Sequence, residues 1–297
     1  MINVECEDFI RVRTDLILES SEIAEPEKEY MSGIKIEEKN LKEKDIKITD
    51  VQIISDTVAK RLGKQKGRYI TIEAASLMDS NEESYHINVS EELKKAIISM
   101  LSMHNNIRHI LVAGLGNHDA MPDALGPVTV SNLRITRNID EDAEYIISAI
   151  VPNVMAKTGM ESAEVLQGIV AMTHPDLVIV IDALAARRME RLGRTIQITD
   201  TGIEPGSGVM NRRKKVNKEV LGVPVIAIGV PTVIDAGTIV YDAISKISSD
   251  EDAKELKKYI DDYSENMYVT PKDIDDYIKR VSYTLSEAIN GMSGIKK

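Results

Sequence analysis

The sequence predicts an α/β fold, a sandwich in which helices cover a mainly parallel sheet. Apolar runs rich in β-branched side chains have the length of buried parallel strands. Segments with helical apolar spacing separate these runs, so strands and helices alternate from about residue 108 onward. The expected strands lie at 46–48, 68–73, 110–113, 177–181, 195–199 and 223–230.

Start signals place the expected helices between these strands. Ser90 is a good N-cap for a helix with apolar residues at helical spacing, and 158–161 has the pattern of a capping box. A third helix is expected to start at 231–232, directly after a strand. Residues 270–271 supply a cap and a proline for the first turn of a C-terminal amphipathic helix.

Composition and length indicate one large domain, or one domain with an appendage, and neither a membrane nor a nucleic-acid partner. The 297 residues can bury a substantial core. No apolar stretch reaches the roughly 20 residues that span a bilayer, and the acidic N-terminus is not a secretory signal, so we expect a cytoplasmic protein. A formal net charge of −11 argues against direct nucleic-acid binding, which needs a basic surface. The single cysteine, Cys6, excludes an internal disulfide.

Several polar segments have no specific signal of their own. The glycine turn 114–117 lacks the third glycine of a dinucleotide fingerprint, because Asp119 stands there, so a tight turn is favoured over a phosphate loop. The loop 200–208 either connects two elements or contacts a substrate, and its Ser207 lacks the elbow motif of serine hydrolases. The charged segments expected to be solvated are 25–29, 37–44 and 212–215.

Two aspartates that follow apolar runs are the candidate catalytic residues. Asp123 comes after the run 110–113 and its glycine turn, and Asp182 follows 177–181 directly. Ligands of open α/β sheets bind outside the carboxyl ends of the strands, so both carboxylates can reach one site. Converging carboxyl groups share a proton, because repulsion and burial raise one pKa. Such a pair can activate water and hydrolyse a peptide without a metal or cofactor.

The pattern alone leaves two other roles open for these aspartates. Asp123 has the position of an N-cap before 124–126, and Asp182 has that of a cap for a helix through Ala186. Together with one histidine they could also hold a divalent metal ion. The candidate histidines are His109, His118 and His174.

Five segments, in order along the chain, resemble the germination protease family of spore-forming bacteria. They are 114–117, 122–127, 182–187, 200–208 and 222–233. The resemblance implies a three-layer α/β sandwich similar to hydrogenase-maturation proteases. It also implies an endopeptidase that degrades small acid-soluble spore proteins in the spore core during germination. Members of the family are homotetramers made as zymogens, and no cofactor or metal is implied.

The resemblance carries residue roles with it. The two aspartates proposed as catalytic in the family match Asp123 and Asp182. Its zymogen cleavage falls after an Arg-Thr-Asp sequence, which implies a cut between Asp15 and Leu16. The expected domains are therefore a propeptide, 1–15, and a single protease domain, 16–297. Substrates of the family are similarly cut after an acidic residue and before a large apolar one.

The sequence thus predicts a self-processing acid endopeptidase in which two aspartates share general acid and base work on a water molecule. Two alternatives belong to other classes of protein. One is a metal-dependent protease or maturation factor that uses the same carboxylates. The other is a non-enzymatic spore binding protein in which both aspartates cap helices.

Overall fold

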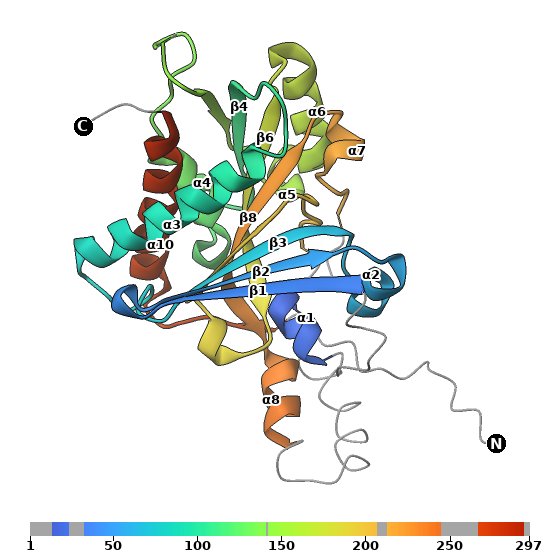
Figure 1. The fold of residues 1–297 in the computed structure, drawn as a ribbon, viewed down its shortest axis with the longest axis vertical. Helices are drawn as coiled ribbons and strands as arrows, with labels where there is room; N and C mark the ends of the chain where they lie inside the picture. The colour runs from blue at the N-terminus through green and yellow to red at the C-terminus, as the bar shows by residue number, and fades with distance from the viewer. Residues whose placement is uncertain (1–13, 24–32, 141, 207–212, 245–266, 294–297) are drawn as a thin grey trace, which may run out of the picture.

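In the part of the chain that the structure describes, helices cover both faces of a nine-stranded sheet (Figure 1). The computed structural model describes residues 14–23, 33–140, 142–206, 213–244 and 267–293. The predicted α/β sandwich is confirmed. The strands are β1 (Ile34–Leu41), β2 (Ile46–Ile53), β3 (Gly67–Ala74), β4 (His109–Gly114), β5 (Ile146–Ile150), β6 (Leu177–Ala186), β7 (Thr195–Thr199), β8 (Val225–Asp235) and β9 (Tyr268–Val269).

The helices lie between and around these strands. The α-helices are α1 (Ile17–Ile23), α2 (Asp56–Leu62), α3 (Glu83–Leu101), α4 (Leu125–Ser131), α5 (Met155–Thr158), α6 (Ser162–Thr173), α7 (Lys218–Leu221), α8 (Ala236–Ile244) and α10 (Ile274–Asn290). The 3₁₀ turns are η2 (Lys42–Lys44), η3 (Met121–Asp123), η4 (Met189–Arg191) and η6 (Gly291–Ser293).

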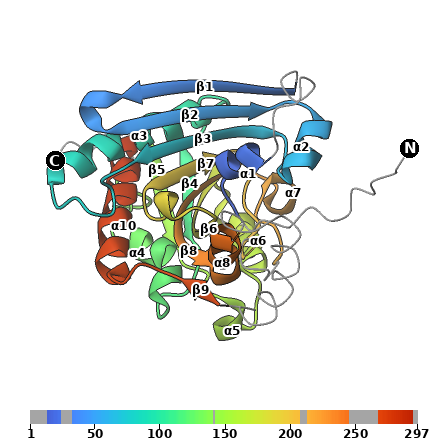
Figure 2. The same ribbon diagram turned by 90° about the horizontal axis from the view of Figure 1, so that it is seen from below.

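The sheet has a parallel half and an antiparallel half. Its order is β1-β2-β3-β7-β8-β6-β4-β5, with β9 beside β8. The strands β5, β4, β6 and β8 are parallel, which is the part that the alternation of strands and helices predicts. The strands β1, β2, β3 and β7 pair antiparallel, and Figure 2 shows β1, β2 and β3 side by side at one edge.

Alternate residues of the central strands pack on opposite faces of the sheet. In β6, Ile179 and Ile181 join a core with residues of α3 and α10. Val178 and Val180 join a second core with residues of α6. Because both faces are buried, the run 177–181 is continuously apolar instead of alternating.

The charged segment 37–44 is solvated, as its composition predicts, but most of it belongs to β1. Side chains from Lys35 to Asn40 are exposed. Their backbone nevertheless pairs with β2 along the whole of β1, from Ile34 with Ile53 to Leu41 with Ile46. Ladder hydrogen bonds therefore form this strand without burial of its side chains.

Two helix starts differ from the prediction. The helix α3 begins at Glu83, and Ser90 lies inside it with its hydroxyl donating to the Ile87 carbonyl. Its buried face already includes His86 and Val89, which extends the apolar spacing backwards. The capping box before α6 is formed by Glu161 and Glu164 instead of Thr158, because a carboxylate accepts the same backbone bonds.

Two further predicted starts also lie elsewhere. Residues 231–232 continue β8, which runs on to Asp235 because β6 still pairs with it; α8 begins only at Ala236. The C-terminal helix α10 is confirmed and begins at Ile274, with Asp273 as its N-cap. The hydroxyl of Thr270 donates instead to the Thr232 carbonyl, 2.9 Å away.

Some predictions concern residues outside the described ones. These are Cys6, the segment 25–29, Ser207, Arg212 and the expected propeptide before Thr14. Within the described ranges, no helix combines the length and the apolar character needed to cross a bilayer.

Candidate active site

Asp182 lies inside a strand, not at its end. The last pair between β4 and β6 is Gly114 with Ile181, so Asp182 is the first residue of β6 beyond β4. On its other side β6 continues to pair with β8, where Asp182 faces Gly229. The predicted helix through Ala186 is therefore wrong, and Asp182 caps no helix. It is β4 that ends here, one residue before Asp182 in the pairing, and the carboxylate of Asp182 lines a cavity beyond this end.

Asp123 lies at the end of η3, just after β4. The backbone N–H of Asn117 donates to the carboxylate Oδ2 of Asp123 at 2.9 Å and to its carbonyl oxygen at 3.0 Å. The helix α4 starts at Leu125 with Ala124 as its N-cap and no side-chain cap bond. The alternative in which Asp123 caps this helix is therefore wrong, because its carboxylate accepts from the glycine turn instead.

The glycines of this turn allow backbone segments to touch. Gly116 has φ +109°, and a Cβ atom there would lie 2.0 Å from the Asp123 carbonyl oxygen. A Cβ atom on Gly126 would lie 2.6 Å from the Ile181 carbonyl oxygen, next to Asp182. These contacts bring the turn after β4 against β6, as expected for a tight turn.

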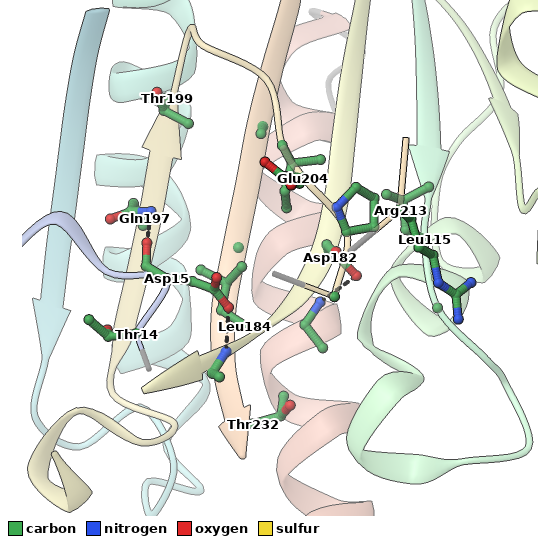
Figure 3. Close-up of a pocket in the computed structure, with 18 of the residues that line it drawn as sticks. Thr14, Asp15, Leu115, Asp182, Leu184, Gln197, Thr199, Glu204, Arg213 and Thr232 are labelled. Atoms are coloured by element: carbon green, nitrogen blue, oxygen red, sulfur yellow. Dashed lines mark hydrogen bonds between the residues drawn. The ribbon is translucent and has the colours of Figure 1, made fainter. Parts of the chain in front are cut away.

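Both aspartates line one cavity of about 1050 Å³. Figure 3 shows Asp182 in this lining, together with Asp15 and Arg213. Its wall also includes residues 201–206, so the loop that the sequence leaves undecided faces the same space. Arg213 and Lys215, from the basic segment predicted to be solvated, line it as well. Lys215 is exposed, whereas Arg213 is half-buried.

Burial and mutual repulsion bias the two carboxyl groups toward different protonation states. Burial, followed by the charges of Asp123 and Asp15, raises the pKa of Asp182 well above its usual range. The Ala183 N–H, 3.0 Å from Oδ1, and Arg213 oppose this increase in the pKa only partly. Burial raises the pKa of Asp123 to about 6, with the Asn117 N–H and Arg213 opposing it. The pair therefore favours a state in which the two carboxyl groups share one proton, and burial favours the protonated form of Asp182 most strongly.

The expected cleavage residues lie in the same place. Asp15 lines the cavity, and its charge contributes to the raised pKa of Asp182. The Asp15 N–H donates to the Ala185 carbonyl at 3.0 Å, and the Ala185 N–H donates to the Asp15 carboxylate at 2.8 Å. Leu16 is fully buried in a cluster with side chains of β6 and β8.

Two residues that the sequence does not single out hold this segment. Lys64 and Gln197 both donate to the Asp15 carbonyl oxygen, at 2.7 Å and 3.2 Å. Gln197 lies in β7 and is 7 % exposed. In the sequence it is recognisable only as a polar residue at an inward position of the expected strand 195–199. Lys64 follows the C-terminus of α2, where no pattern distinguishes it from neighbouring lysines.

The three candidate histidines lie apart from the aspartate pair. His109, His118 and His174 are exposed, and none of them lines the cavity. In the described part of the chain, no group of three or more His, Cys, Asp and Glu side chains is arranged to hold a metal ion.

Comparison with known proteins gives one consistent family. The germination protease family matches residues 12–257. The germination protease of Caldanaerobacter subterraneus subsp. tengcongensis is 44% identical over 310 aligned residues, covering 94% of this chain and 93% of the relative. That of Clostridium perfringens (strain ATCC 13124) is 39% identical, covering 94% of each. That of Priestia megaterium is 44% identical, covering 80% of this chain and 67% of the relative.

A solved structure also overlaps with part of the fold. It is the [NiFe] hydrogenase maturation protease HycI from Thermococcus kodakarensis KOD1. The overlap covers 64% of this chain and 98% of that protein, with 17% sequence identity and a TM-score of 0.35.

Proposed function

The chain belongs to the germination protease family, and from this premise we propose that it is a self-processing aspartic endopeptidase. Its proposed substrates are the small acid-soluble proteins of the spore. We extend the proposal to a zymogen that forms homotetramers in the spore core. One observation carries the catalytic part: two carboxyl groups line one cavity, and the charge of one raises the pKa of the other.

In the proposed reaction the two aspartates start in different protonation states. Ionised Asp123 takes a proton from a water molecule, whose oxygen attacks the scissile carbonyl carbon. Protonated Asp182 gives its proton to the carbonyl oxygen, which yields a neutral tetrahedral intermediate. When the C–N bond breaks, the proton on Asp123 passes to the leaving amine, and the hydroxyl proton returns to Asp182. Atoms and charges balance, and the pair returns to its starting state.

The raised pKa values support this assignment of base and acid. A carboxyl with a pKa of about 6 is ionised at neutral pH yet basic enough to accept a proton from water. Asp182, nearly fully buried with 5 % of its surface exposed, is the group that keeps its proton. Arg213, which favours the ionised form of both carboxyls, limits how far their pKa values rise.

Self-processing at the bond between Asp15 and Leu16 is supported by the position of this peptide. Asp15 already lies in the cavity that holds the aspartate pair. Its sequence, an acidic residue followed by leucine, has the form of the sites that the family cleaves. The same cavity would therefore serve the cut in the chain itself and the cuts in its substrates.

Substitution of each aspartate tests the proposal. Asp182→Asn and Asp123→Asn should abolish both the appearance of Leu16 as a new N-terminus and the digestion of a small acid-soluble spore protein. Mass spectrometry of the protein incubated at mildly acidic pH reads the first, and gel electrophoresis reads the second. Asp119→Asn is the matched control, because Asp119 is exposed on the same turn and pairs with Lys157.

Two results would contradict the proposal. Wild-type turnover by Asp182→Asn, after deamidation has been excluded, would remove this residue from the reaction. Loss of activity on exhaustive chelation, restored by a divalent metal, would favour the metal-dependent alternative over an aspartate pair.

A further inference from the structure

The segment 14–17 is bound like a peptide ligand in the candidate site. Each polar group of Asp15 has a partner from the cavity wall: the N–H and carboxylate bond to Ala185, and the carbonyl oxygen accepts from Lys64 and Gln197. Figure 3 shows Asp15 and Gln197 joined by one of these bonds, in the same lining as Asp182.

A free strand edge provides the partner for the backbone. Among the described residues, no strand pairs with β6 on the β4 side beyond Ile181. Ala185 lies in this stretch, and both of its backbone groups bond to Asp15. Addition of an extended peptide to an exposed strand edge is a common mode of peptide recognition, in which main-chain bonds give affinity and side-chain pockets give specificity.

The Gln197 side chain extends this backbone recognition. Its Oε1 accepts from the Ile17 N–H at 2.7 Å, while its Nε2 donates to the Asp15 carbonyl at 3.2 Å. The side-chain amide of Gln197 thus bonds to a backbone donor and a backbone acceptor two residues apart, as the backbone of a neighbouring strand would. These contacts do not depend on the side chains of the bound peptide.

The side chains of the segment enter two chemically different environments. Lys64 places its ammonium group 2.7 Å from the Asp15 carbonyl oxygen. Burial lowers the pKa of Lys64, and the charges of Asp15 and Glu19 oppose this decrease, so an acidic residue bound here favours the charged form of the lysine. Leu16 enters a fully apolar cluster that includes Leu184 and Ile234. An acidic side chain followed by a large apolar one therefore matches this site.

Lys64 is held in place by the end of a helix. Gly63 ends α2 in the left-handed conformation, at φ 63°, and the Lys64 N–H donates to the Ala59 carbonyl at 3.0 Å. The backbone of Lys64 is therefore fixed, and its side chain reaches the cavity from a rigid element. Lys66, two residues later, pairs instead with Asp56 at the surface.

We propose that Lys64, Gln197 and the Ala185 backbone form the subsite that selects an acidic residue followed by a large apolar residue in a polypeptide substrate. This proposal rests on the proposed endopeptidase function. Lys64 and Gln197 are positioning residues: they orient the carbonyl of the acidic residue, and the Leu16 cluster accepts the residue after it. The segment 14–17 occupies the subsite within its own chain, and a substrate would occupy it in the processed enzyme.

Hydrogen exchange tests the contacts without requiring cleavage. In full-length protein carrying Asp182→Asn, Lys64→Met and Gln197→Ala should each speed amide exchange at Asp15 and Ile17 by about tenfold, as expected for the loss of one buried hydrogen bond. Lys66→Ala should leave this exchange unchanged. Thermal melting monitored by circular dichroism confirms that each variant is folded.

Peptide cleavage tests specificity. The probe is a decapeptide copy of residues 12–21, Val-Arg-Thr-Asp-Leu-Ile-Leu-Glu-Ser-Ser, with a second peptide that carries Asn in place of Asp. In processed enzyme, Lys64→Met should raise KM for the Asp peptide about tenfold and change kcat by less than twofold. It should raise KM for the Asn peptide by a smaller factor, because that peptide loses the same bond to its carbonyl oxygen but has no charge that the ammonium group attracts. Lys64→Arg should restore most of the preference, and Lys66→Ala should match wild type.

The outcomes separate this proposal from the one on which it rests. Equal losses for the Asp and Asn peptides, or unchanged exchange at Asp15 and Ile17, would overturn the subsite while wild-type cleavage still supports the endopeptidase. Failure of wild-type enzyme to cut the Asp peptide and any spore protein would overturn the proposed function, and the subsite with it.

Discussion

Gly116 and Asp123 pack backbone against backbone: a Cβ atom on Gly116 would lie 2.0 Å from the Asp123 carbonyl oxygen. The contact places the Asp123 carboxylate next to the Asn117 N–H, which donates to it. The position of one catalytic candidate therefore depends on the absence of a side chain seven residues earlier.

Gly116→Ala should destabilise the protein and reduce its activity. The new methyl group collides with backbone, which cannot rotate away, and φ +109° is unfavourable for alanine. Gly159→Ala is the control, because Gly159 also has a positive φ (+71°) but no atom within 4 Å of an added Cβ. Urea unfolding should show a loss of about 1–2 kcal/mol for the control and a clearly larger loss for Gly116→Ala. Equal losses would mean that the turn adjusts without cost.

Asp182→Asn should make the protein more stable at neutral pH. Because the pKa of Asp182 is raised in the folded state, its stabilising contribution is present below the unfolded pKa, near 4, and is lost as pH rises through the folded value. Asparagine has no proton to lose, so the variant should gain relative to wild type between pH 4 and 7. The size of the gain measures how far the folded state raises the pKa of Asp182.

Asp119→Asn is the control for Asp182→Asn, because it should change stability at neutral pH in the opposite direction. The ion pair with Lys157 lowers the pKa of Asp119, so its contribution is present above the unfolded pKa and is lost as pH falls. This variant should be slightly less stable than wild type at pH 7 and equal to it at low pH. Urea unfolding at a series of pH values measures both variants, and the same sign for both would contradict the assignment.

The pH profile of cleavage should rise through about pH 6. Asp123 must be ionised to act as the base, and burial raises its pKa to about 6. At higher pH the rate should fall again as Asp182 loses its proton, which gives a bell-shaped kcat/KM profile. Both limbs report on the pair jointly. A rate that is flat from pH 4 to 8 would exclude the proposed acid and base roles.

Glu19→Gln should weaken the processed chain more than the intact one. The buried Glu19 carboxylate accepts the N–H groups of Arg187 and Arg188, both at 2.8 Å, and also the Thr14 hydroxyl. In the intact chain the Leu16 N–H donates to that same hydroxyl, at 3.1 Å. A cut after residue 15 removes Thr14 and leaves an ammonium group on Leu16, for which the Glu19 carboxylate becomes the partner.

Thermal unfolding of both forms checks this expectation. The loss caused by Glu19→Gln should be greater in the processed form by about 1–3 kcal/mol, the range for a hydrogen bond to a charged group. Equal losses in the two forms would show that the new N-terminus does not pair with Glu19.

Much of the fold follows from local pattern, but strand length does not. An aspartate after five apolar residues suggests that the strand 177–181 ends, because an unpaired charge is costly to bury. In the structure β6 continues to Ala186 because β8 runs alongside it, and burial raises the pKa of Asp182, which favours the uncharged form of this side chain. The same pairing carries β8 past Pro231. Neighbouring strands, which a linear pattern does not reveal, determine these ends.

In the candidate site too, the sequence predicts some residues and not others. Asp123 and Asp182 follow apolar runs, and the sheet brings both to one cavity as expected. Lys64 and Gln197 carry no such signal, since they reach Asp15 only through the order β3-β7-β8-β6 and the end of α2. Their role becomes visible only in the structure, where both side chains contact Asp15.

The segment 14–17 is covalently attached to the protein whose cavity it helps to line. A tethered ligand acts at an effective concentration on the order of millimolar, and this value is independent of how dilute the protein is. Dilution alone therefore cannot displace the segment from the cavity wall while the chain is intact. After a cut behind residue 15, residues 14 and 15 belong to a separate peptide. Its binding to the enzyme is then an equilibrium between two molecules, and dilution shifts this equilibrium toward the free enzyme.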